Sequence, residues 1–150
     1  MIKNISNLGD AAVYCDFGSE VNETINSNVI NYFNNLTDLV KKEKIKGINN
    51  LTPSYNKLII SFDLSITNFL KLKEIIENLN IDKNTKKENK NIKIPVCCDN
   101  EYGLDFDRLK NKLNLSKEEI LKLFFNKEYF CYMTGFIAGM PFLGDVNEKI

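Results

Sequence analysis

The spacing of hydrophobic residues changes several times along residues 1–80, and each change predicts a different element. Residues 11–17 alternate weakly between apolar and polar, which is typical of a strand with one buried face. From Val21 to Val40 the apolar residues recur every three to four positions, which predicts an amphipathic helix. Ser19 or Asn22 can cap the start of this helix.

Three further strands and a second helix are predicted in the same region. The strands are expected at residues 2–8, 45–51 and 55–63, and a helix that Ser65 can cap is expected over residues 69–79. The resulting order is strand, strand, helix, strand, strand, helix. Two helices in this order must cover one face of an antiparallel-rich sheet, so we predict an α+β, ferredoxin-like layer.

A run of charged and amide residues from Asp82 to Lys93 interrupts the pattern. It contains five lysines, three asparagines and one apolar residue, Ile92. This composition is typical of a solvated linker, and a nucleic-acid-binding segment would be expected to carry interleaved aromatic residues. We therefore predict an N-terminal domain at residues 1–84, a linker at 85–91 and a second domain at 92–150.

Beyond this run, the pattern predicts a strand, two helices and a final strand. The first strand is expected at residues 92–98, and Asp105 can cap the helix that follows. Residues 116–119, Ser-Lys-Glu-Glu, fit a capping box that opens the next helix. The last strand is expected at residues 128–134.

Charge and composition exclude several classes of function. Lysine plus arginine and aspartate plus glutamate both number 20, so the net charge of zero does not indicate nucleic acid or a membrane surface as a partner. The chain has no histidine, which excludes Ser-His and Cys-His nucleophile pairs and histidine metal ligands. It lacks an apolar run long enough for a signal peptide or a membrane span, and we expect a cytoplasmic protein.

The four cysteines, Cys15, Cys97, Cys98 and Cys131, lack the paired CxxC spacing of a zinc site. Cys97 and Cys98 are adjacent in an expected strand, so their side chains should point to opposite faces. Buried, unpaired thiols are therefore favoured over a metal or redox site, and no metal is predicted.

One segment near the end of the chain, residues 135–144, combines three glycines and a proline with large apolar residues. Consecutive amides in such a loop can hold a substrate or a phosphate, and its apolar side chains can contact a partner chain. The alternative is a packed turn that leads to the next strand. The residues predicted to form this substrate-binding or partner loop are Gly135, Phe136, Gly139, Pro141, Phe142, Leu143 and Gly144.

Three segments carry a resemblance to a known family. Residues 94–106, Ile-Pro-Val-Cys-Cys-Asp-Asn-Glu-Tyr-Gly-Leu-Asp-Phe, resemble the strand-to-helix signature that opens the family's second domain, and residues 115–119 resemble its Leu-Ser-x-Glu-Glu helix start. Residues 128–144, Glu-Tyr-Phe-Cys-Tyr-Met-Thr-Gly-Phe-Ile-Ala-Gly-Met-Pro-Phe-Leu-Gly, resemble its last motif. The chain is thus similar to the family of B-type 5-oxoprolinase subunits, allophanate hydrolase subunit 1 and KipI, which is also the carboxyltransferase domain C and D family.

The last motif departs from the family pattern at several positions. Ala138, Met140 and Phe142 stand where the family has Pro, Phe and Tyr, and Cys131 replaces a Val. The family also continues for some tens of residues beyond this motif. The resemblance therefore implies a ferredoxin-like first domain followed by only the incomplete start of a cyclophilin-like β-barrel.

The resemblance implies a non-autonomous subunit of a heteromeric, ATP-dependent 5-oxoprolinase, which opens the lactam of 5-oxoproline to give L-glutamate. It implies that ATP is bound jointly with partner subunits. These partners would be a C-type 5-oxoprolinase subunit or KipA-type protein and an A-type, lactam-opening protein. The resemblance is also compatible with a homo-oligomer of this chain. The same family includes KipI-type inhibitors of a sensor histidine kinase and subunits related to allophanate hydrolase and urea carboxylase, and these are the alternatives.

Three carboxylates match the family pattern and are candidates for acid–base chemistry: Asp99, Glu101 and Asp105. The alternative is that they are turn and helix-cap residues. No catalytic residue is assigned from the sequence.

Overall fold

The computed structural model describes residues 1–81 and 90–150. Their contacts divide the chain into two compact units, of which the first comprises Met1–Lys86 with Tyr132–Phe142 and the second comprises Lys87–Cys131 with Leu143–Ile150. The segment Tyr132–Phe142 thus groups with the N-terminal residues. Most of the predicted linker at 85–91 lies outside the described residues, and the predicted domain boundaries remain a prediction.

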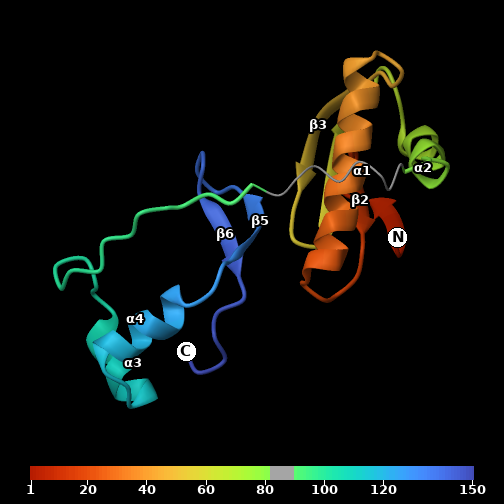
Figure 1. The fold of residues 1–150 in the computed structure, drawn as a ribbon. Coiled ribbons are helices and arrows are strands. Elements are labelled where there is room, and N and C mark those ends of the chain that lie inside the picture. Colours follow the sequence, from red (N-terminus) through yellow and green to blue (C-terminus); the bar gives the residue numbers. More distant parts are fainter. Residues whose placement is uncertain (82–89) are drawn as a thin grey trace. The chain divides into compact units, whose positions relative to one another are not determined.

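The first unit contains a four-stranded antiparallel sheet and two helices (Figure 1). The strands are β1 (Asn4–Asn7), β2 (Ala12–Asp16), β3 (Ile48–Pro53) and β4 (Lys57–Phe62), in the spatial order β1-β2-β4-β3, and the helices are α1 (Glu23–Lys41) and α2 (Phe69–Glu77). The predicted order of elements is confirmed, and the chain is of the α+β class. The series β2-α1-β3-β4-α2 follows the first five elements of the ferredoxin-like order, while β1 precedes them and pairs with β2.

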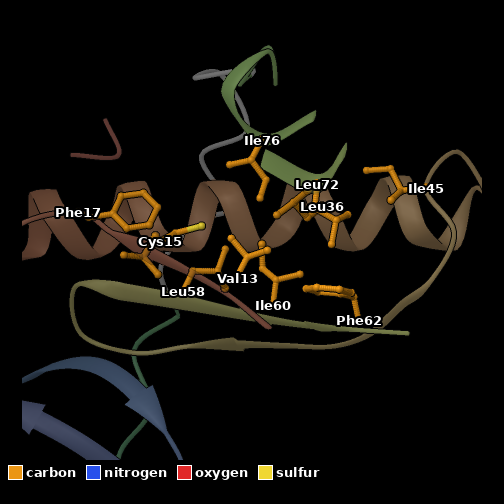
Figure 2. Close-up of a cluster of buried hydrophobic side chains, with 11 residues drawn as sticks. Val13, Cys15, Phe17, Leu36, Ile45, Leu58, Ile60, Phe62, Leu72 and Ile76 are labelled. Carbon is orange, nitrogen blue, oxygen red and sulfur yellow. The ribbon is translucent and has the colours of Figure 1, made fainter. Parts of the chain in front are cut away.

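Both helices pack on the same face of this sheet. Buried and partly buried residues alternate along β2 and β4, so one face of each strand supplies the core. Figure 2 shows these side chains together with those of α1 and α2. The buried cluster consists of Val13, Cys15, Phe17, Val29, Leu36, Ile45, Leu58, Ile60, Phe62, Leu72 and Ile76.

The helix caps confirm one sequence prediction and correct another. Asn22, rather than Ser19, caps α1, and its side chain accepts a hydrogen bond from the backbone N–H three residues later. The prediction that Ser65 caps α2 is wrong, because the cap is Asn68. Both the N–H and the hydroxyl of Ser65 donate instead to the carboxylate of Asp63, which holds a turn ahead of the helix.

The prediction of buried cysteines holds for Cys15 only. Its thiol lies in the core, and burial raises its pKa to about 12. Cys97 and Cys131 are exposed and Cys98 is partly buried. Spacing alone showed that these residues do not form a CxxC pair, but burial depends on neighbours that the local sequence does not specify.

An ion pair joins β2 to β4 at the end of the sheet. Asp16 and Lys57 are directly opposite each other in the register, and the Lys57 ammonium donates to the Asp16 carboxylate and to the carbonyl oxygen of Gly18. The bond from Lys57, the Gly18 N–H bond and the charges of Lys57 and Lys3 keep the pKa of the Asp16 carboxyl below its usual value. A depressed pKa in the folded state means that ionised Asp16 stabilises the fold.

We therefore expect Asp16→Asn to lower the free energy of unfolding at neutral pH by about 1 kcal/mol or less, because the pair is partly exposed. The stabilisation is present above the unfolded pKa of about 3.9 and is lost as the pH falls through the lower folded pKa. Urea unfolding should thus show a difference between wild type and variant at neutral pH that vanishes under strongly acidic conditions. Asp10→Asn, at an exposed turn position, is the control. It should leave the free energy of unfolding unchanged both at neutral pH and under strongly acidic conditions. An equal effect of Asp16→Asn at both pH values would contradict this assignment.

The second unit contains two short helices, α3 (Phe106–Leu113) and α4 (Lys117–Phe125). The capping box at the start of α4 is confirmed, since Ser116 Oγ accepts from the Glu119 N–H and the Glu119 carboxylate accepts from the Ser116 N–H. Asp105 occupies the cap position of α3, but its side chain makes no capping hydrogen bond. It pairs with Arg108 instead, at 3.0 Å between carboxylate and guanidinium.

The prediction of a strand at residues 92–98 is wrong. No strand occurs among the described residues between α2 and α3, and Ile92, Ile94 and Val96 are exposed. Without a pairing strand, a short run of β-forming residues has no partner for its backbone hydrogen bonds and no face to bury. Cys97 and Cys98 therefore do not lie on the two faces of a strand.

The last elements are the strands β5 (Phe130–Thr134) and β6 (Pro141–Gly144), which form a two-stranded sheet. β5 lies within the strand predicted at residues 128–134. The connection is far shorter than the dozen or more residues that a parallel crossover needs, so the two strands form an antiparallel hairpin. Among residues 90–150, this hairpin is the whole of the β-structure that the expected barrel opening supplies.

Candidate functional site

The glycine-rich segment forms the tip of the β5–β6 hairpin. The N–H of Gly135 donates to the carbonyl oxygen of Met140 (3.1 Å), and the N–H of Ile137 donates to the carbonyl oxygen of Gly135 (2.8 Å). Gly139 has a φ of 81° and Phe136 a φ of 66°, in the left-handed region that is uncommon for a residue with a side chain. The tip is thus a tight, internally hydrogen-bonded turn that holds Phe136 in an unusual backbone conformation.

These hydrogen bonds limit what the loop can offer to an anion. The N–H groups of Gly135, Ile137 and Met140 are all used inside the turn. At most the N–H groups of Phe136, Ala138 and Gly139 are left to hold an oxyanion or phosphate.

The apolar residues of the hairpin divide into an anchored side and an exposed side. Tyr132 is buried and Phe142 is partly buried. Phe136 and Ile137, at the tip, are 90% and 63% exposed. The predicted binding loop therefore contains two kinds of residue, because Phe142 belongs to the packing of the hairpin and Phe136 projects from it.

The anchored side packs against Tyr55, in the turn between β3 and β4. The ring of Tyr55 lies 5.5 Å from the ring of Tyr132 and 6.2 Å from that of Phe142, centre to centre. The second contact has the edge-to-face geometry that aromatic pairs favour. All three residues belong to the first compact unit.

A buried asparagine adds polar contacts at the same place. Asn26 is 1% exposed, and its side-chain amide nitrogen lies within hydrogen-bonding distance of the carbonyl oxygens of Ser54 (3.2 Å), Tyr55 (2.9 Å) and Tyr132 (3.1 Å). The sequence patterns did not single out Asn26 or Tyr55. A usable signal was present for Asn26, which lies three residues before Val29 on the apolar stripe of the predicted helix.

The remaining predicted loop residues lie on β6. Pro141, Phe142, Leu143 and Gly144 form this strand, while Gly135, Phe136 and Gly139 lie in the turn. The segment is a turn that leads to the next strand, and its tip exposes apolar side chains. Its role as a substrate-binding or partner loop stays a prediction.

The three carboxylates are surface residues of the second unit. The backbone carbonyl oxygen of Asp99 accepts hydrogen bonds from the N–H groups of Tyr102 (3.0 Å) and Gly103 (2.9 Å), which forms a turn. Glu101 is exposed in this turn, and Asp105 pairs with Arg108. Asp99 and Glu101 thus lie in a turn, while Asp105 does not cap α3 through its side chain. An acid–base role for the three carboxylates stays a prediction.

No group of three or more cysteine, aspartate and glutamate side chains is arranged to hold a metal ion within residues 1–81 and 90–150. In the same ranges, no helix has the length and apolarity to cross a bilayer. An open depression of about 300 Å³ lies beside β1 in the first unit, and its lining includes Lys3, Tyr32 and Lys73.

The fold and the hairpin motif together place the chain in a known family. The chain belongs to the family described as carboxyltransferase domain, subdomain C and D, whose model matches residues 3–150. This confirms the family resemblance.

The chain is similar to the 5-oxoprolinase B subunit of Bacillus subtilis (strain 168), with 28% identity over 158 aligned positions. The alignment covers 97% of this chain and 64% of the relative, so the chain spans just under two thirds of the relative's length.

Solved structures show the same fold. The crystal structure of TTHA0988 in space group P212121 matches with a TM-score of 0.74 and 25% identity, over 92% of this chain and 26% of that chain. A second crystal form, in space group P6522, matches with a TM-score of 0.70 and 24% identity, over 93% of this chain and 25% of that chain. The matched region is about a quarter of a much longer polypeptide.

Proposed function

We propose that this chain acts as a B-type subunit of a heteromeric 5-oxoprolinase, which opens 5-oxoproline to L-glutamate with ATP. The observation that carries the proposal is the similarity to a 5-oxoprolinase B subunit over 97% of the chain. The family match over residues 3–150 supports it. Substrate, ATP and partners are part of the proposal.

The chemistry explains why such a protein needs partners. A lactam is a stable amide, and transfer of the terminal phosphoryl group of ATP to its carbonyl oxygen would make the carbon susceptible to water. ADP would leave at this transfer. One water would then add to the carbon and the ring C–N bond would break, which gives γ-glutamyl phosphate, and a second water would release phosphate and glutamate. Within the described residues, this chain supplies surface carboxylates and the hairpin tip, and the chain has no histidine to serve as a base. The partners of the C or KipA type and of the A type would supply the rest.

The hairpin tip is the part of this chain that we assign to the shared site or to the contact with a partner. Phe136 and Ile137 are exposed there, and up to three amides remain to hold a developing oxyanion or a phosphate. We place the reaction in the cytoplasm, where ATP is available and an exposed thiol such as Cys97 stays reduced.

One observation also favours a second candidate function. Exposed apolar side chains at a hairpin tip suit a pure binding role, such as that of a KipI-type inhibitor of a sensor histidine kinase. Affinity isolation of the tagged chain from its own cells separates the two. Copurification of the A- and C-type partners is the expected result, and copurification of a histidine kinase in their place would overturn the proposal.

A further inference from the structure

The buried amide of Asn26 lies where three distant parts of the chain meet. Ser54 and Tyr55 belong to the turn between β3 and β4, and Tyr132 belongs to β5, 106 residues away from Asn26 in the sequence. The amide carries two hydrogens and lies 2.9–3.2 Å from three carbonyl oxygens, so both hydrogens have protein acceptors. A buried polar group on the apolar stripe of a helix is costly unless it is bonded in this way.

The turn that supplies two of these carbonyl oxygens also supplies an aromatic surface. The ring of Tyr55 contacts Tyr132 on β5 and Phe142 on β6, one residue from each strand of the hairpin. The backbone of Tyr55 therefore binds Asn26, while its side chain packs against the hairpin. All of these residues belong to the first compact unit, which includes Tyr132–Phe142.

We propose that Asn26 and Tyr55 form a clasp that fixes the segment Tyr132–Phe142 to α1 and to the β3–β4 turn. In this role, Asn26 and Tyr55 are positioning residues. They contact both strands of the hairpin and thereby determine where the exposed tip, with Phe136 and Ile137, is presented. The hairpin is held in this way whichever ligand or partner the tip binds.

The clasp can be tested by an isosteric change that removes the donor. Asn26→Asp places a carboxylate oxygen where the amide nitrogen faces three carbonyl oxygens, so attraction becomes repulsion. Amide hydrogen exchange is the measurement, because it reports local opening segment by segment. We expect residues 132–142 to exchange about tenfold faster or more, with a much smaller change in the core strand β4.

The matched control is Asn35→Asp, the same change on the same helix. The amide of Asn35 donates to the carbonyl oxygen of Asn31 within α1, so this variant should leave exchange of residues 132–142 unchanged. Tyr55→Leu is the second test variant, because it removes the ring contacts and keeps the backbone carbonyl. It should open the same segment selectively, and it serves as the test if Asn26→Asp does not fold.

For both Asn26→Asp and Tyr55→Leu, two outcomes of the hydrogen-exchange measurement would contradict the clasp. Equal acceleration in residues 132–142 and in β4 would mean that the two residues only stabilise the fold as a whole. Unchanged exchange in residues 132–142 in a folded variant would mean that the hairpin is held without them. Either result overturns the clasp.

Discussion

Replacing Leu72 with alanine is expected to lower the free energy of unfolding by about 2–5 kcal/mol. Leu72 is 1% exposed and belongs to the buried cluster, on the face of α2 that packs on β2. Removing its side chain deletes buried contacts and leaves a cavity that the surrounding side chains fill only in part. Small domains are stable by about 5–15 kcal/mol in total, so this loss is a large fraction. Urea unfolding followed by circular dichroism measures it.

Leu70 provides a control on the same helix. It lies two residues earlier in α2 and is 74% exposed, so Leu70→Ala makes the same chemical change without opening a cavity. We expect a change within about 0.5 kcal/mol. Similar losses for the two variants would show that α2 does not cover the sheet in the way described.

Replacing Gly47 with alanine is expected to cost about 2–5 kcal/mol. Gly47 has a φ of 84°, which disfavours any residue with a Cβ. A Cβ there would lie 2.9 Å from Thr67 Cγ2 and 3.0 Å from Ile66 Cβ, and Thr67 is buried. Backbone strain and overpacking therefore act together. The loss should appear as a lower urea midpoint with an unchanged slope.

Gly9 separates the two causes. Its φ of 62° is also in the left-handed region, but nothing lies within 4 Å of an added Cβ. Gly9→Ala should therefore show the backbone cost alone, about 1–2 kcal/mol. If Gly47→Ala and Gly9→Ala lowered the free energy of unfolding equally, the close approach of Gly47 to Thr67 would contribute nothing to the loss.

The sequence predicts elements well where the signal is local. Apolar residues recur every three to four positions from Val21 to Val40, and this spacing matches α1. The capping box that begins with Ser116 correctly predicts the start of α4. The strand predicted at residues 92–98 fails because a strand also needs a partner, which is not a local property. The cap of α2 is Asn68 and not Ser65, because both donors of Ser65 bind the Asp63 carboxylate in a turn ahead of the helix.

In the candidate site, too, the sequence predicts what is local and not what depends on distant residues. Glycines, a proline and large apolar residues singled out residues 135–144, and the structure places a tight hairpin there. Which side chains are anchored and which are exposed depends on Asn26 and Tyr55. Both lie more than 70 residues earlier in the chain. No local pattern in the loop could reveal that Phe142 packs on Tyr55 while Phe136 projects.

We propose that this chain is a necessary subunit of an ATP-dependent 5-oxoprolinase, on the strength of its similarity to a 5-oxoprolinase B subunit. The direct measurement is glutamate release from 5-oxoproline by a complex reconstituted from this chain and its A- and C-type partners. Glutamate should form only when ATP, this chain and the partners are all present. An unchanged rate when this chain is left out would contradict the claim, as would no glutamate from a mixture in which the folded chain is bound to its partners.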